Sequence, residues 1–346
     1  MAYHTSTTPW IGTPSPVLVS LGLLEEELMK FGVHFGSRGI AGEPDSLTAV
    51  AQKCEALGFA HFGMSDHVIV ATEVDSAYPY SASGKFFAQD TGVSLEQVTA
   101  LSFVAAATSK IRLLTSVLVL PHRHPVLAAK MLATVDVLSK GRLTAGVGVG
   151  WMAEEIALLG GPNFADRAAA SDEYIEAFRE LWTADHPSQS GDFAAFEHLL
   201  FAPKPLQTPY PPIWIGGESK PARRRTGRYG DGWYPVAANP RAPLDTAERY
   251  GAALADVREE AEVAGRDPQS VEGALLAIYC RIGDEQEGWK GDRLTFTGSA
   301  TAIVDDIGRF AEAGLQHFLI GGDGSDLSNT LDRLEQFEAE VMSVLR

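Results

Sequence analysis

The sequence predicts a single (β/α)8 barrel, and three observations lead to this fold class. Short apolar runs alternate with longer amphipathic stretches from residue 29 to the C-terminus. Such alternation is typical of parallel strands joined by helical crossovers. Eight strand–helix units can be counted, which favours closure into a barrel over an open sheet. A length of 346 residues suits one such barrel with insertions in its loops.

The predicted elements alternate in order along the chain. The strands are short apolar runs, expected at residues 31–35, 61–65, 111–120, 143–149, 213–215, 232–236, 271–279 and 317–320. The helices have apolar residues at helical spacing and are expected at residues 46–57, 95–110, 125–139, 171–182, 220–229, 244–265, 300–313 and 327–345. Gly58 directly follows the first helix, as a C-terminal cap does.

Three connections are longer than turns, at residues 68–94, 184–212 and 281–299. Loops of this length in a compact domain are usually functional. The first and the third follow strands, so we expect them at the C-terminal rim, where barrel active sites lie. The second starts on the opposite face, where we expect a hairpin or an interface element.

The first 28 residues differ from the rest of the chain. They contain Pro9, Pro14 and Pro16 and show no strong period, and a strand begins soon after Met29. We interpret residues 1–28 as an N-terminal extension of a barrel domain at 29–346, or as an arm that packs on its surface.

The composition limits the classes of molecule that this protein is expected to bind. A net charge of −17 disfavours nucleic acid and anionic membranes, because phosphate groups would be repelled. The two cysteines, Cys54 and Cys280, form no metal-type motif and fit a reducing, cytoplasmic location. No secretory leader or membrane-length apolar run is visible. We therefore expect a cytoplasmic protein that acts on a small molecule, with no metal.

Asp66 and His67 end the second predicted strand and are the candidate catalytic pair. A histidine at the C-terminal rim is placed to exchange protons near neutral pH. Asp66 would orient this histidine or bind substrate. The alternative is a loop histidine beside a capping aspartate.

The fourth predicted strand ends in a glycine-spaced run. Gly146, Gly148 and Gly150 alternate, so one face lacks side chains and a flat ring can approach the backbone. Trp151 stands where a dinucleotide fingerprint needs glycine, so we set a Rossmann site aside. Glu154 and Glu155 follow, and this pair of carboxylates either binds cofactor hydroxyls or lies in a solvated helix start.

Several other motifs allow two interpretations. Ser116 and Val117 lie in an apolar strand and mark a bulge or a ligand approach, or else a hydroxyl bonded to backbone. Gly216, Gly217 and Ser219 precede a helix and form a candidate anion site. Arg123 is placed at the rim to hold an anionic group, and its two flanking histidines lack further metal ligands. The arginines at 223–225 are interpreted as a solvated helix face.

Together these motifs resemble the luciferase-like monooxygenases, and within them the branch that uses the deazaflavin coenzyme F420. The resemblance runs in order from Met29 to the end of the chain. Its matching segments are residues 57–59, 65–67, 78–81, 84–86, 115–118, 123–125, 129–130, 141–151, 154–155, 212–217 and 230–233.

The resemblance implies roles for these residues. His67 would match the active-site histidine, with Asp66 beside it near the flavin-type ring. Ser116 and Val117 would match a non-prolyl cis peptide that forms a bulge behind the ring. The remaining cofactor contacts would be made by Gly148, Val149, Gly150 and Glu154 along the cofactor, and by Gly216, Gly217 and Ser219 at its phosphate end.

One position departs from the resemblance. Trp151 stands where some F420-dependent dehydrogenases have a glutamate implicated in acid–base work, which puts a sugar-phosphate dehydrogenase role in doubt. Trp151 instead offers a stacking wall for an apolar substrate. Tyr80, in the matching segment 78–81, is the second expected substrate contact.

Three functions follow as hypotheses. The first is hydride transfer between F420 and a small organic substrate, with the cofactor carrying the redox chemistry. The second keeps the fold but uses FMNH2 and oxygen as a monooxygenase, and then needs a separate flavin reductase. The third is a non-catalytic flavin-binding protein, which would not need both the Asp66–His67 pair and the glycine face. The resemblance also implies a homodimer.

Overall fold

A computed structural model describes residues 28–81, 83–86, 94–288 and 291–346 of the chain. The predicted extension therefore lies outside the described residues except for Leu28, and it stays a prediction. In the described part, eight parallel strands close into a barrel. They are β1 (Lys30–Phe35), β2 (His61–Met64), β3 (Arg112–Thr115), β5 (Leu143–Gly148), β8 (Ile213–Gly216), β9 (Gly232–Tyr234), β10 (Glu272–Ala277) and β13 (His317–Gly321).

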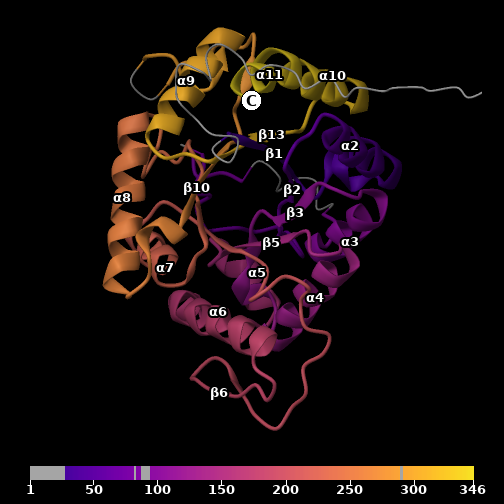
Figure 1. Cartoon of the computed structure of the whole chain (residues 1–346), viewed down its shortest axis with the longest axis vertical. Helices are drawn as coiled ribbons and strands as arrows, with labels where there is room; N and C mark the ends of the chain where they lie inside the picture. The colour runs from indigo at the N-terminus through magenta and orange to yellow at the C-terminus, as the bar shows by residue number, and fades with distance from the viewer. Residues whose placement is uncertain (1–27, 82, 87–93, 289–290) are drawn as a thin grey trace, which may run out of the picture.

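Closure follows from two pairings between distant segments. β1 pairs with β13 in parallel, with Lys30 opposite His317, and β3 pairs with β5, with Leu113 opposite Leu143. The predicted barrel fold is confirmed. Figure 1 shows the helices surrounding the strands. These helices are α2 (Pro44–Ala56), α3 (Gln97–Ala107), α4 (Pro125–Leu138), α6 (Arg167–Thr183), α7 (Lys220–Tyr229), α8 (Ala247–Val263), α9 (Ala300–Glu312) and α10 (Leu327–Phe337).

Two predicted elements are interrupted. The apolar run 111–120 divides into β3, a cis peptide bond between Ser116 and Val117, and β4 (Leu118–Val119), followed by the short helix η3 (Leu120–His122). The C-terminal helix expected at 327–345 continues from α10 through a π-helical turn, η6 (Glu338–Met342), into α11 (Ser343–Leu345).

The loops hold short elements that were not predicted individually. They are η2 (Gly39–Gly42), α5 (Ala153–Leu158), η4 (Phe164–Asp166), η5 (Pro268–Ser270), β11 (Arg281–Ile282) and β12 (Thr297–Gly298).

The long connection after α6 contains an antiparallel hairpin, which agrees with one of the two expectations for that segment. Its strands are β6 (Gln189–Ser190) and β7 (Ala195–Phe196), and Figure 1 shows it projecting away from the barrel. The carboxylate of Glu173 on α6 accepts backbone hydrogen bonds from Asp192, Phe193 and Ala194 at 3.2, 2.8 and 3.0 Å. One carboxylate thus anchors the tip of the hairpin.

The barrel interior changes from polar to apolar along its axis. At the N-terminal end of the strands, Nε2 of His61 contacts Nδ1 of His317 at 3.0 Å, and Nε2 of His317 lies 3.3 Å from the Glu272 carboxylate. Above them lies an apolar layer made of Leu114, Trp214, Tyr234, Ala274, Leu276 and Leu319. The larger core fills the space between the strands and the helices. No described helix is long and apolar enough to span a membrane.

Candidate active site

His67 is held by a buried carboxylate at the C-terminal rim. Its Nδ1 lies 2.8 Å from Oε2 of Glu155, a residue of α5 that is fully buried. The second oxygen of Glu155 accepts hydrogen bonds from the backbone N–H groups of Val68 and Ile69 at 2.8 and 3.1 Å. Because a carboxylate only accepts, Nδ1 of His67 is the donor in this contact, which leaves Nε2 as the nitrogen that can exchange a proton.

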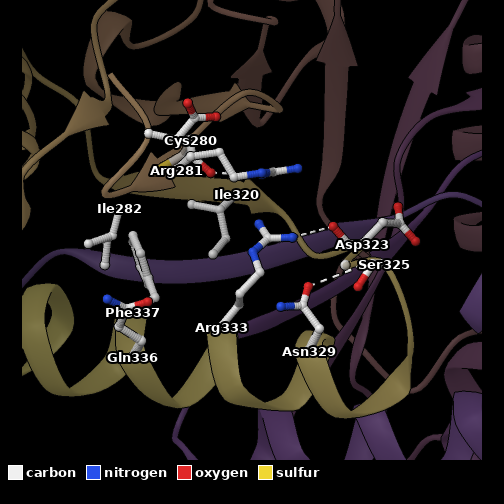
Figure 2. A pocket seen from close by; sticks show the side chains of 12 residues that line it. Cys280, Arg281, Ile282, Ile320, Asp323, Ser325, Asn329, Arg333, Gln336 and Phe337 are labelled. Carbon is white, nitrogen blue, oxygen red and sulfur yellow. Dashed lines mark hydrogen bonds between the residues drawn. The ribbon is translucent and has the colours of Figure 1, made fainter. Parts of the chain in front are cut away.

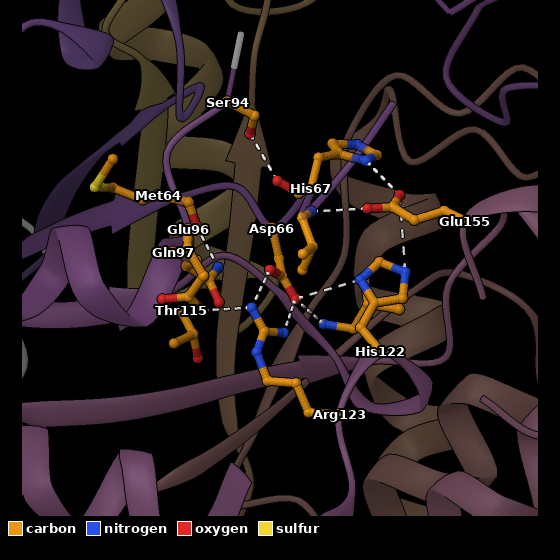
Figure 3. A network of polar contacts seen from close by, with 12 residues as sticks. Met64, Asp66, His67, Ser94, Glu96, Gln97, Thr115, His122, Arg123 and Glu155 are labelled. Atoms are coloured by element: carbon orange, nitrogen blue, oxygen red, sulfur yellow. Dashed lines mark hydrogen bonds and ion pairs between the residues drawn. The ribbon is translucent and has the colours of Figure 1, made fainter. Parts of the chain in front are cut away.

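Asp66 has a different role from the one expected. Its carboxylate pairs with Arg123 through both oxygens, at 2.7 and 2.8 Å, and accepts a hydrogen bond from the backbone of Val119 at 2.8 Å (Figure 3). Burial would raise the pKa of Asp66, but His122 and Arg123 hold it well below its usual range. Asp66 therefore anchors the segment after the β3–β4 bulge, and Glu155 is the residue that orients His67.

Arg123 is consequently not available to a ligand. Besides Asp66, it donates to the carboxylate of Glu96 at 2.5 Å, and its side chain is 7% exposed. Its neighbour His122 is buried, with Nδ1 3.7 Å from Asp66 and Nε2 3.8 Å from Glu155. In the described residues, no group of three or more histidine, cysteine or acidic side chains is placed to hold a metal ion.

Glu154 anchors the loop after β2. One of its oxygens accepts backbone hydrogen bonds from Asp75 and Ser76 at 2.8 and 3.1 Å, and the hydroxyl of Ser76 accepts from the backbone of Ala153 at 3.0 Å. Glu154 was expected to bind cofactor hydroxyls or to lie in a solvated helix start. The structure instead places its carboxylate on the loop backbone, which draws residues 68–81 over the rim.

The anchored loop forms an aromatic cluster with the end of β5. The ring centroid of Trp151 lies 5.1 Å from Tyr78, 5.2 Å from Phe86 and 6.3 Å from His67. Tyr80 packs edge-on against Tyr78 at 5.5 Å, and its main-chain oxygen accepts from the hydroxyl of Tyr279 at 3.2 Å. The two predicted substrate contacts, Trp151 and Tyr80, therefore lie on one apolar wall beside His67.

A chain of polar groups crosses the barrel mouth beneath this wall. Nδ1 of His34 on β1 lies 2.8 Å from Oγ of Ser116, which lies 2.8 Å from the hydroxyl of Tyr234 on β9. Burial and the nearby charge of Arg38 lower the pKa of His34 to about 4. Burial also raises the pKa of Tyr234 above its usual range. The two groups are therefore neutral near pH 7 and act as hydrogen-bonding partners.

The glycines of β5 accommodate the neighbouring bulge. A Cβ atom on Gly146 would lie 2.1 Å from the main-chain oxygen of Thr115, and one on Gly148 would lie 2.7 Å from the side chain of Val117. The approach of a flat ring to this glycine face stays a prediction. The partly exposed side chain of Val117 lies against Gly148 and also approaches Gly216.

The predicted phosphate site has the expected local structure. Gly217 has φ of 109°, and Ser219 caps α7, its hydroxyl accepting from the backbone of Ala222 at 3.3 Å. Free N–H groups at a helix start favour a phosphate group, and Lys220 adds a positive charge there. Val149 and Gly150 lie beyond the end of β5 and are partly exposed. The residues present thus fit a flat ring with a phosphate arm.

A buried carboxylate lies beside this phosphate site. Glu218 accepts from the backbone of Val236 at 2.8 Å and from the Asn239 amide at 2.7 Å. Burial raises its pKa.

The predicted solvated arginine face is only partly present, because Arg225 is buried and pairs with Asp172, while Arg223 pairs with Asp256 at 3.0 Å.

Sequence reasoning missed some of these residues and the structural roles of others. His34 is a lone polar residue in an apolar strand, and that pattern marks a side chain pointing into the barrel. Glu155 stands out in the sequence only as a neighbour of Glu154, although their adjacency on a helix sends the two side chains in different directions. Nothing local in the sequence identifies Tyr234 or Glu218, whose partners lie on other elements.

Comparison with known proteins links most of this chain to one family. The profile of the family described as luciferase-like monooxygenase matches residues 29–317. The chain is 32% identical to an FMNH2-dependent dimethylsulfone monooxygenase of Pseudomonas putida over 239 residues, which are 66% of this chain and 65% of that protein. It therefore spans just under two thirds of that relative. An uncharacterized protein of Mycobacterium tuberculosis is 33% identical over 61% of this chain and 71% of its own length.

Solved structures show the same fold at lower identity. An F420-dependent secondary alcohol dehydrogenase in complex with an F420–acetone adduct superposes with a TM-score of 0.71 and 20% identity, over 92% of this chain and 99% of the other. A monooxygenase from Streptomyces bottropensis superposes with a TM-score of 0.71 and 21% identity, over 91% of this chain and 99% of the other.

Proposed function

This chain belongs to the luciferase-like monooxygenase family, and from that premise we propose that it transfers a hydride between coenzyme F420 and a small organic substrate. The observation that supports the proposal is the His67–Glu155 pair, which lies beside an apolar wall and could exchange a proton with a bound substrate. When bound, the deazaflavin would supply the hydride chemistry.

The chain's own residues would handle the proton and the orientation of the substrate. Nε2 of His67 accepts or supplies the proton that accompanies the hydride, with Glu155 fixing the ring and its tautomer. Trp151 and Tyr80 hold the apolar part of the substrate and exclude water. Ser116 and Tyr234, which are linked to His34, would offer hydrogen bonds to the bound cofactor.

A second candidate keeps the same site but uses FMNH2 and oxygen. It is favoured by the 32% identity to an FMNH2-dependent dimethylsulfone monooxygenase. A flavin and a deazaflavin share the flat ring and the phosphate arm, so the residues around Val117 and Ser219 fit both. This candidate requires a reductase partner that delivers the reduced flavin.

Equilibrium binding to F420 and to FMN, measured in parallel, tests the proposal. We expect F420 to bind at least about tenfold more tightly, a difference of about 1.4 kcal/mol. Preference for FMN would overturn the deazaflavin proposal in favour of the second candidate. If neither cofactor bound, both candidate functions would be contradicted. The hypothesis of a non-catalytic flavin-binding protein would be contradicted as well.

A pair of histidine variants separates binding from turnover. His67→Ala should keep the cofactor affinity within a few-fold and abolish turnover in a screen of small alcohols and carbonyl compounds, because it removes only the proton-exchanging group. His198→Ala, a change at an exposed histidine, should match the wild type in both measurements. Full turnover by His67→Ala would contradict the role of His67.

A further inference from the structure

A polar pocket lies at the rim beside the last two barrel strands, outside the site described above. It has a volume of about 550 Å³ and opens between α10 and the segments that follow β10 and β13 (Figure 2). Loops after the seventh and eighth strands are a frequent phosphate-binding position in barrels of this class. The predicted cofactor phosphate site at 216–219 follows the fifth strand, so this pocket is a separate place.

Two arginines that line the pocket donate to main-chain oxygens. Arg281 donates to the main-chain oxygens of Cys280 at 2.8 Å and Gly321 at 3.5 Å. Arg333 donates to the main-chain oxygen of Asp323, and at 3.5 Å to the same Gly321 oxygen. The two guanidinium groups thus converge on one carbonyl. Neither forms an ion pair with an acidic side chain of the described residues.

The carboxylates of Asp323 and Asp284 attract these arginines, but they form no ion pair with them at contact distance among the described residues. Asp323 accepts a hydrogen bond from the backbone of Gly36 at 3.3 Å, and Figure 2 shows its carboxylate pointing away from Arg333. Asp284 accepts from the Gln286 amide at 3.0 Å. Burial, followed by the charge of Arg281, lowers the pKa of Arg333, and the nearby Asp323 only partly offsets this effect. An anion placed between the two arginines would relieve their repulsion.

We propose that this pocket binds a small oxyanion, such as a carboxylate, sulfonate or phosphate group, between Arg281 and Arg333. A guanidinium group presents several N–H donors in one plane, which matches the oxygen atoms of such a group. Asn329 and Ser325, at the start of α10, line the same pocket and add polar atoms to it.

The oxyanion is assigned to the substrate because a short series of contacts links the pocket to the aromatic wall. Asp323 bonds the backbone of Gly36, and Arg38, two residues on, lies over the ring of Phe86 at 5.7 Å. Phe86 in turn packs on His67 and Trp151. A substrate with an apolar end beside Trp151 could thus extend an acidic end toward Arg281. This assignment rests on the proposed function, whereas binding of a free oxyanion does not.

Titration with inorganic phosphate tests the site without a cofactor. Binding is measured by calorimetry at an ionic strength that chloride keeps constant. We expect saturable binding to the wild type and at least a tenfold loss of affinity in Arg281→Gln and Arg333→Gln, a factor equal to about 1.4 kcal/mol. Arg309→Gln, at an exposed arginine of α9, is the matched control and should bind as the wild type does.

Two further variants separate charge from donor geometry, and this pocket from the cofactor site. Arg333→Lys keeps the charge but not the planar donors, and should bind with intermediate affinity if the protein is folded. Ser219→Ala alters only the predicted cofactor site, so the phosphate binding that persists in this variant is assigned to the arginine pocket. Absence of phosphate binding in the wild type, or wild-type affinity in both glutamine variants, would overturn the proposal.

Cofactor titrations in saturating phosphate identify the source of the oxyanion. Unchanged F420 and FMN affinities would support a substrate group as the natural occupant. Weaker F420 binding with unchanged FMN binding would overturn the substrate assignment and give the pocket to the acidic glutamyl tail of F420. Failure of F420 and FMN to bind at all, with phosphate binding intact, would refute the proposed function but not the oxyanion site.

Discussion

At the scale of single residues, chemistry in this barrel depends on which carboxylate faces which partner. Three acidic residues near His67 look alike in the sequence, yet each has a separate task. Asp66 fixes Arg123, Glu154 fixes the loop backbone, and Glu155 fixes His67. The sequence located His67 at the rim but could not assign its partner, because that choice depends on the packing of α5 against the loop after β2.

Glu155→Gln tests the role of the buried carboxylate. The glutamine oxygen can still accept from Val68 and Ile69, but its N–H₂ group then faces Nδ1 of His67 and moves the ring proton to Nε2. We expect kcat to fall about 10- to 100-fold with little change in cofactor affinity, and the pH profile of kcat to shift.

Glu154→Gln is the matched control for this change. It alters the adjacent residue, which also accepts two backbone hydrogen bonds but does not contact His67. Its pH profile should match that of the wild type. Equal profiles in both variants would show that Glu155 acts only as a loop anchor.

At the scale of elements, the alternation of strands and helices was predictable because each unit buries its own apolar face. The helix at 220–229 agrees with α7 at both ends, since Ser219 and Gly230 supply local caps. The division of residues 111–120 was not predictable from composition, because the bulge depends on space that β5 provides. Only the likeness to a known family indicated the cis peptide at Ser116–Val117, and the structure confirms it.

Gly146→Ala tests that dependence of β3 on β5. The added methyl group would lie 2.1 Å from the Thr115 oxygen, so the backbone must move. We expect a loss of about 1–3 kcal/mol in the free energy of unfolding, measured with urea. Gly308→Ala in α9, where no atom lies within 4 Å, should instead stabilise by about 0.5–1 kcal/mol. A stable Gly146→Ala variant would contradict this account of the glycine.

At the scale of the whole molecule, closure of the barrel buries histidines that must remain neutral. Burial lowers the pKa of His61 and of His317 at the N-terminal end of the barrel, and of His34 near the mouth. Lys30 and Arg112 further disfavour the charged form of His61, while Glu272 favours that of His317. The count of strand–helix units predicted closure, but the residues brought together inside belong to strands far apart in the chain.

These histidines predict how stability depends on pH. Below about pH 6.5, the usual histidine pKa, the unfolded chain binds protons that the folded chain does not. The free energy of unfolding should therefore be at its maximum above that pH. It should fall as the pH drops, by up to about 1.4 kcal/mol per pH unit for each histidine.

Urea unfolding between about pH 7.5 and 5.5 measures this slope on either side of the histidine pKa. His61→Gln removes one titrating group and should reduce the slope. His198→Gln, at a histidine whose side chain is 88% exposed, should leave the slope unchanged. Identical slopes in the wild type and His61→Gln would rule out His61 as a contributor.

The anchoring of loops by single carboxylates bears on how such a barrel can diversify. Glu155 and Glu154 anchor the loop over the mouth, and Glu173 anchors the hairpin on the other side of the molecule. Each anchor bonds main-chain N–H groups, which every residue except proline provides. Loop sequences between anchors can therefore be exchanged or lengthened while the barrel and the anchor stay the same. A lineage built this way can acquire new substrates through changes in its loop sequences, while the barrel that carries the loops stays the same.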